Sequence, residues 1–132
     1  MESIVLDSSV VIAFLNPTDR HHLVAQKEIA QAVVHFQIST ITVTESMVAV
    51  ASQSEAVANG FLADLNKFFG PFLPLDSETA VAAAKLRAKT NLAVPDAIIS
   101  ASATKAKAEL WTFDKALAKA HSSPRSKARL LG

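Results

Sequence analysis

Four acidic side chains stand where the sequence predicts that a strand ends or a helix begins. Asp7 directly follows one apolar strand-like run, and Asp114 follows another by two residues. Asp96 opens an expected helix, and Glu45 lies about one turn into a different one. Because the carboxyl ends of parallel strands share one edge of a sheet, we expect the four carboxylates to point into one crevice.

Carboxylates gathered in this way repel one another and raise each other's pKa unless a cation neutralises them. Hard oxygen ligands favour Mg²⁺ or Mn²⁺ over zinc. A divalent ion held there polarises a phosphoryl oxygen and lowers the pKa of a bound water. The pattern therefore favours metal-dependent hydrolysis of a phosphodiester.

Each acid also has a simpler explanation when it is taken alone. Asp7 and Asp114 could cap the helices that follow them, and Asp96 could favour the positive end of its own helix. Glu45 could be an ordinary exposed helical residue. The hypothesis of a metal site depends on the joint placement of the four acids, and on the cost of burying an unpaired Asp at the end of an apolar strand.

Apolar runs and turn residues predict alternating strands and helices along the chain. The expected strands are 3–6, 35–39, 72–75, 109–112 and 128–131. The expected helices are 8–15, Thr18 or Asp19 to about 34, 40–52, 54–69, 77–90, 95–107 and 114–120. This alternation indicates an α/β fold with a central parallel sheet of four to five strands and helices on both faces.

Length and composition narrow the class of protein further. A chain of 132 residues corresponds to a single domain, 1–132, with one core. There is no cysteine, which fits a reducing cytoplasm, and no apolar run approaches the roughly 20 residues of a membrane span. Half of the residues are apolar and the mean hydropathy is +0.27, which suggests that a partner covers part of the surface.

The net charge is only +1, but its distribution is uneven. Every charged residue beyond Asp114 is basic, namely Lys115, Lys119, Arg125, Lys127 and Arg129. A basic end beside an acidic pocket could hold a phosphate backbone. On its own, this run is better explained as a solvated terminus.

Four segments of the sequence resemble the acidic motifs of PIN domains, in the family's order and over essentially the whole chain. The opening run 4–9, Ile-Val-Leu-Asp-Ser-Ser, is similar to the family's first strand and first acid. The other three are Ser39–Glu45, Pro95–Ala103 and Leu110–Asp114. The size and simplicity of the chain point to the VapC-type toxins of prokaryotic toxin–antitoxin pairs.

The resemblance implies a PIN-like three-layer sandwich and a Mg²⁺-dependent endoribonuclease, with Mn²⁺ able to substitute, that hydrolyses RNA by a metal-activated water. It implies that the four acids are both metal-binding and catalytic, and that Ser8 and Thr112 support a carboxylate or a water. It further implies a cytoplasmic homodimer silenced by a cognate VapB-type antitoxin. The chain departs from the family in having Lys107-Ala108-Glu109 where many members carry a glycine.

Two other classes of function remain open at this point. A Mg²⁺-dependent phosphatase or receiver-type α/β domain would need an acidic pair near the first strand, where this chain has the single Asp7, and a phosphate-accepting Asp such as Asp76. A non-catalytic PIN-like binding module is disfavoured because all four acids are present. The four histidines are interpreted as surface or packing residues rather than metal ligands: His21, His22, His35 and His121.

Overall fold

A four-stranded sheet with all strands parallel forms the centre of the computed structural model, which describes residues 2–132. The strands are β1 (Ser3–Leu6), β2 (His35–Gln37), β3 (Glu109–Thr112) and β4 (Ala128–Leu130). Their spatial order is β2-β1-β3-β4, and Val5 of β1 pairs with Gln37 on one side and Leu110 on the other. The carboxyl ends of β1 and β3 therefore meet at one edge of the sheet.

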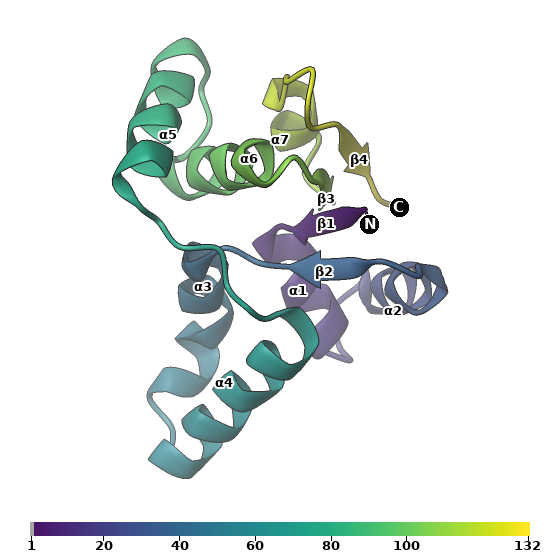
Figure 1. Cartoon of the computed structure of the whole chain (residues 1–132). Coiled ribbons are helices and arrows are strands. Elements are labelled where there is room, and N and C mark those ends of the chain that lie inside the picture. Colours follow the sequence, from purple (N-terminus) through teal and green to yellow (C-terminus); the bar gives the residue numbers. More distant parts are fainter. Residues whose placement is uncertain (1) are drawn as a thin grey trace.

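Helices connect the strands and cover both faces of the sheet, with α5, α6 and α7 on one side and α1 and α4 on the other (Figure 1). The helices are α1 (Ser8–Leu15), α2 (His22–Gln31), α3 (Thr40–Ala51), α4 (Glu55–Phe69), α5 (Ser77–Lys89), α6 (Val94–Ala106) and α7 (Lys115–Ala120). No helix within residues 2–132 combines the length and apolarity that crossing a bilayer requires. The expected three-layer α/β architecture is confirmed, with four strands.

Alternation along the strands divides the core into two parts, because successive side chains of a strand point to opposite faces. Val5 and Leu110 are fully buried against α5, α6 and α7. Leu6 and Trp111, the next residue of each strand, pack on the opposite face with side chains of α1 and α4. Both faces are thus apolar, as expected for a parallel sheet covered on each side.

Polar caps start the helices that follow the strands. Asp7 is the N-cap of α1 and its side chain accepts from the backbone N–H of Val10, while Ser39 caps α3 in the same way. Asp114 caps α7. Because these caps immediately follow or nearly follow β1, β2 and β3, they lie at the carboxyl edge of the sheet.

The predicted strand 72–75 is wrong. Leu73 makes a single parallel bridge to Ser39, with its N–H donating to the carbonyl of Ile38, and the pairing extends no further. Pro74 has no N–H to continue a ladder, so the apolar run crosses the edge of the sheet without joining it as a strand.

The predicted start of the second helix at Thr18 or Asp19 is also wrong, because α2 begins at His22. Asn16 accepts from the N–H of Thr18, and Asp19 accepts from the N–H of His21, so these polar side chains stabilise a turn instead of a helix start. The helix also ends before the predicted residue 34, at Gln31. The strand expected at 35–39 ends at Gln37, since the next residues bond to Leu73 and cap α3.

The turn between α6 and β3, where the chain lacks the family's frequent glycine, is formed by Lys107. The backbone of this residue has the left-handed helical conformation, with φ 54° and ψ 37°, and its N–H donates to the carbonyls of Ala103 and Thr104. The N–H of Ala108 also reaches the carbonyl of Ala103. A lysine thus adopts a conformation that glycine reaches with less strain.

Candidate active site

The four predicted acids share one electrostatic neighbourhood. Asp7 directly follows β1, Asp114 lies beyond the end of the adjacent β3, Asp96 is in the first turn of α6, and Glu45 is in α3. Burial raises the pKa of Asp96 to about 6, helped by repulsion from Asp114, Asp7 and Glu45, in that order. The fold therefore brings together carboxylates from four separate parts of the sequence, and no Lys or Arg contributes to this shift.

Asp7 is the most enclosed of these acids, with only 3% of its surface exposed. Oδ1 accepts from the hydroxyl of Ser9 at 2.6 Å and from the N–H of Val10 at 3.1 Å, and Oδ2 accepts from the hydroxyl of Thr112 at 2.5 Å. Burial raises the pKa of Asp7, and the three hydrogen bonds oppose that rise because they stabilise the charged form.

The two hydroxyls that donate to Asp7 also fix the turn after β3. Ser9 Oγ accepts from the N–H of Phe113 at 3.2 Å, and Thr112 Oγ1 accepts from the N–H of Asp114 at 2.9 Å. Each hydroxyl therefore joins a carboxylate oxygen of Asp7 to the backbone at or next to Asp114. This hydroxyl clamp, consisting of Ser9 and Thr112, holds two of the acids in a fixed relation.

Ser9 belongs to the clamp but was not among the predicted site residues. A usable signal was present, since a hydroxyl two residues after an N-cap Asp can bond back to the cap's carboxylate. Thr112 does contact a carboxylate, as its predicted supporting role requires. Its effect on catalysis stays a prediction.

Glu45 is held by a hydroxyl from a different helix. Ser8, the first residue of α1, lies with its Oγ 2.6 Å from Glu45 Oε1 and 3.2 Å from Oγ1 of Thr42. Ser8, predicted to support a carboxylate or a water, thus contacts the carboxylate of Glu45, and its effect on catalysis stays a prediction. Thr42, which is fully buried, was not predicted as a site residue.

Asp114 lies at the exposed side of the group. Its Oδ1 accepts from the N–H groups of Ala116 at 2.8 Å and Leu117 at 3.3 Å, which is the hydrogen bonding of a helix cap. The simpler explanation of Asp7 and Asp114 as N-caps is therefore correct in structure. It does not compete with a chemical role, because capping occupies only part of the acceptor capacity of a carboxylate.

The donors at this site fit a hard divalent cation in charge and in chemical type. Asp114, Asp7 and Glu45 all repel the charge of Asp96 and no Lys or Arg offsets this repulsion, while oxygen ligands are those preferred by Mg²⁺ and Mn²⁺. Within residues 2–132, however, no three His, Asp or Glu side chains are close enough together to coordinate one ion as they stand. Coordination would therefore require some of these carboxylates to turn toward a common point.

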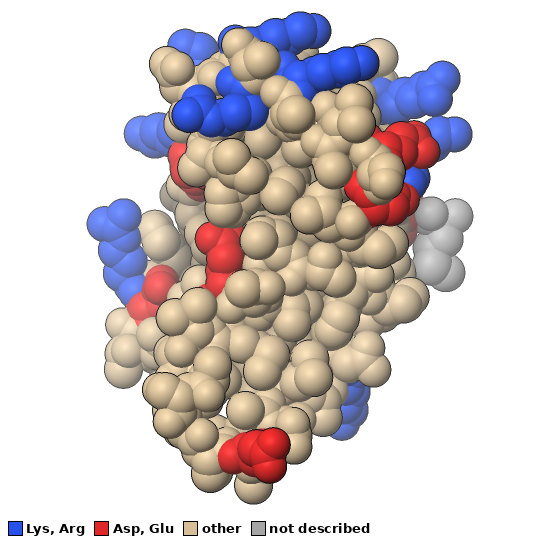
Figure 2. Space-filling view, turned by 90° about the vertical axis from the view of Figure 1, so that its left-hand side faces the viewer, with Lys and Arg blue, Asp and Glu red and all other residues tan. Residues whose placement is uncertain are grey.

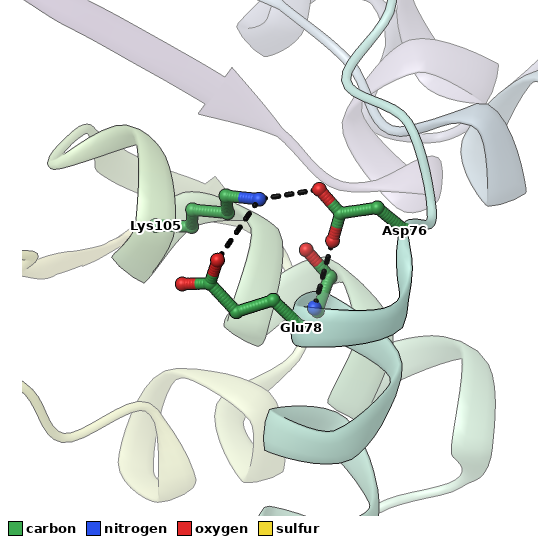
Figure 3. A network of polar contacts seen from close by, with 4 residues as sticks. Asp76, Glu78 and Lys105 are labelled. Atoms are coloured by element: carbon green, nitrogen blue, oxygen red, sulfur yellow. Dashed lines mark hydrogen bonds and ion pairs between the residues drawn. The ribbon is translucent and has the colours of Figure 1, made fainter.

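A separate charged network lies at the opposite end of α6. Lys105 reaches between Asp76 and Glu78, bonding to the former and lying 3.5 Å from the latter (Figure 3). Lys105 holds the pKa of Asp76 well below its usual range. Nine residues of helix, about 14 Å, separate Lys105 from Asp96, so this lysine does not neutralise the acid group.

The same network bears on the receiver-type alternative. That alternative uses Asp76 as a phosphate acceptor at the end of a central strand. In the structure Asp76 is the N-cap of α5, and the segment before it is not a strand of the sheet. The arrangement required by a receiver domain is therefore not formed.

We compared the sequence and the fold with those of known proteins. The PIN domain model matches residues 4–122. No curated protein sequence matches the chain. Among solved structures, FitAcB from Neisseria gonorrhoeae is 24% identical, with 95% of each chain covered and a TM-score of 0.70.

Two further solved structures share the fold. A toxin–antitoxin complex from Klebsiella pneumoniae is 24% identical, covering 93% of this chain and 94% of the other, with a TM-score of 0.72. VapC20 of Mycobacterium tuberculosis, described as a sarcin–ricin loop cleaving toxin, is 18% identical, covering 92% and 99%, with a TM-score of 0.74. These likenesses establish the fold, and because the family model spans most of the sequence, the chain belongs to the PIN-domain family.

Proposed function

We propose that this protein is a Mg²⁺-dependent endoribonuclease that acts as the toxin of a VapBC-type toxin–antitoxin pair. The observation that carries the proposal is that the fold gathers Asp7, Glu45, Asp96 and Asp114 from four separate parts of the sequence, where burial and repulsion from the other three acids raise the pKa of Asp96. Helix capping accounts for Asp7 and Asp114 one at a time but not for the gathering of four carboxylates without a basic counter-charge, whereas a divalent cation would convert their repulsion into binding energy.

The four acids would hold Mg²⁺, or Mn²⁺ in its place. When bound, the ion would polarise the scissile phosphoryl group and activate water for hydrolysis. The chain's own residues would prepare the site, because the hydroxyl clamp fixes Asp7 and Ser8 holds one oxygen of Glu45. Fixed carboxylates lose less conformational freedom when the ion binds.

Exposed basic side chains support an RNA substrate. Lys and Arg gather at the upper end of the face shown in Figure 2, which is the side on which α5 lies in Figure 1. Lys115 directly follows Asp114, and Lys119, Arg125 and Lys127 continue the basic run on exposed positions. None of these four forms an ion pair within the described residues, whereas Arg129 is bound to Glu28 at 2.7 Å. Lys115 is a free cation next to Asp114 and would attract a phosphate backbone at the acids, whereas Arg125 and Lys127 precede β4 and lie toward the opposite edge of the sheet.

Protein partners are supported by the exposed apolar side chains. One group lies on α1, α2 and α4 and includes Leu23, which is 76% exposed, and Phe68, which is 50% exposed. Another lies on and around α5 and α6 and includes Leu75, Val81 and Val94. Since several neighbouring structures are described as toxin–antitoxin complexes, we propose a VapB-type antitoxin and a second copy of the chain as partners.

Controlled expression in a bacterial host tests the biological role. The wild-type protein should arrest growth, and co-expression of a small open reading frame adjacent to its gene should relieve the arrest. Asp7→Asn should be harmless at the same soluble level. Normal growth with abundant soluble wild-type protein would contradict the toxin assignment.

A further inference from the structure

Two hydroxyl groups form a short chain that ends on Glu45. Ser8 Oγ lies 2.6 Å from Glu45 Oε1 and 3.2 Å from Thr42 Oγ1. Thr42 and Glu45 are three residues apart in α3, so both side chains lie on the face of the helix that meets the start of α1. Thr42 is fully buried, and water therefore has no access to replace it.

The number of hydroxyl protons decides which group donates in each of these two hydrogen bonds. A serine hydroxyl has one proton, and an ionised carboxylate only accepts. The short contact with Glu45 takes the proton of Ser8, since hydrogen bonds to charged acceptors are the stronger ones. The contact between Ser8 and Thr42 must then use the proton of Thr42, so that Thr42 donates to Ser8 and Ser8 donates to Glu45.

Thr44, in the same helix, shows what a threonine without such a role does. Its side chain is exposed, and its hydroxyl donates to the carbonyl of Thr40 one turn earlier, at 3.3 Å. Thr42 instead directs its hydroxyl across to α1. This difference within one helix separates a hydroxyl that serves its own backbone from one that serves another side chain.

We propose that Thr42 is a positioning residue for Glu45 and acts through Ser8, an inference that rests on the proposed function. The charge of Glu45 contributes to the repulsion felt by Asp96, so the placement of the Glu45 carboxylate bears on the whole acid group. Donation by Thr42 polarises the hydroxyl of Ser8 and strengthens its bond to the carboxylate. The two hydrogen bonds thus keep Glu45 at the acid group without placing a positive charge beside it.

Matched substitutions at Thr42 and Thr44 test this role. Thr42→Val keeps the shape and removes the hydroxyl, Thr42→Ser restores the hydroxyl, and Thr44→Val is the control. We expect Thr42→Val to lower both Mn²⁺ affinity and kcat for RNA cleavage about 10-fold, with KM for RNA nearly unchanged. Thr42→Ser should stay within about twofold of wild type, and Thr44→Val should equal it. Thr42→Ala replaces Thr42→Val if the latter does not fold.

A double-mutant cycle tests the route through Ser8. If Thr42 acts through Ser8, Thr42→Val should have no further effect on Mn²⁺ affinity in a Ser8→Ala background. Equal behaviour of Thr42→Val and Thr42→Ser, or a full loss from Thr42→Val in the Ser8→Ala background, would overturn the proposal.

The hydrogen-bonded series from Thr42 through Ser8 to Glu45 is a hydroxyl relay. A metal-free crystal structure separates failure of this relay from failure of the proposed function. If wild-type protein neither cleaves RNA nor binds Mn²⁺, the proposed function is wrong. The relay still predicts that Glu45 turns away from Ser8 in Thr42→Val and stays in place in Thr42→Ser. An unmoved Glu45 in Thr42→Val would refute the positioning role.

Discussion

Asp96→Asn should stabilise the metal-free protein at neutral pH while weakening its binding of Mg²⁺. The pKa of Asp96 is about 6 in the folded protein, because of burial and of repulsion from three other acids. In the unfolded chain it returns to roughly 3.9. The folded state therefore binds the proton more tightly, and wild-type stability should fall as the pH rises from about 4 to about 6.

The size of this effect follows from the shift. About two pKa units correspond to about 3 kcal/mol for a fully buried group. Asp96 is only half-buried and lies at the positive end of α6, so we halve the figure and expect a gain of about 1–1.5 kcal/mol from the substitution. In a chain of 132 residues this gain corresponds to roughly 3–6 °C in Tm.

Thermal unfolding in EDTA at pH 7.5 and at pH 4 measures the difference in stability between Asp96→Asn and wild type. Asp96→Asn should melt at a higher temperature than wild type at pH 7.5, and the difference should disappear at pH 4, where wild-type Asp96 is protonated. Added Mg²⁺ should then raise the Tm of wild type more than that of the variant. Equal stability at pH 7.5, or the same gain at both pH values, would refute the account of the repulsion.

Three further substitutions probe the local structure, each by chemical denaturation against wild type. Lys107→Gly should stabilise by about 0.5–1 kcal/mol, because Lys107 has φ 54°; a loss of stability would contradict the assigned strain. Thr112→Val should destabilise by about 1–3 kcal/mol, because it removes a buried hydrogen bond to Asp7, whereas a neutral result would mean that the clamp contributes nothing. His121→Phe should cost about 1–3 kcal/mol, since buried His121 joins Ser100 at 2.6 Å to the chain before β4; an unchanged midpoint would show that this contact is dispensable.

The sequence predicted the fold class because its signals were local. The apolar run Ile4–Leu6 predicted β1, and the polar residue Asp7 that follows it predicted the start of α1. The prediction failed at 72–75, where the apolar run was correct and Pro74 set the limit on pairing. It also failed at the start of α2, since Asp19 is equally suited to cap a helix or to close a turn.

The candidate site was predictable in its acids and less so in its supports. Asp7, Asp96 and Asp114 stand at element boundaries, where a carboxylate is conspicuous, and the fold gathers them with Glu45. Ser9 and Thr42 make their contacts across the fold or back along the chain. Ordinary hydroxyl residues carry no sign of such contacts until the packing of α1 against α3 and β3 is known.

For the apolar residues, too, the sequence predicted one property and the structure was needed for another. The sequence indicated more apolar surface than one small core requires, and the structure locates exposed side chains such as Leu23 and Val94. Composition can therefore predict that apolar side chains are exposed, while their positions come only from the fold.

Cleavage of a labelled single-stranded RNA by purified protein tests the central claim most directly. Wild type and the control Thr44→Val should cleave it with Mg²⁺ and stop on addition of EDTA, whereas Asp7→Asn should lose activity by at least about 100-fold, since it alters a carboxylate at the centre of the site. Cleavage that persists in EDTA and in Asp7→Asn, or no cleavage by folded wild-type protein with Mg²⁺ or Mn²⁺, would contradict the account.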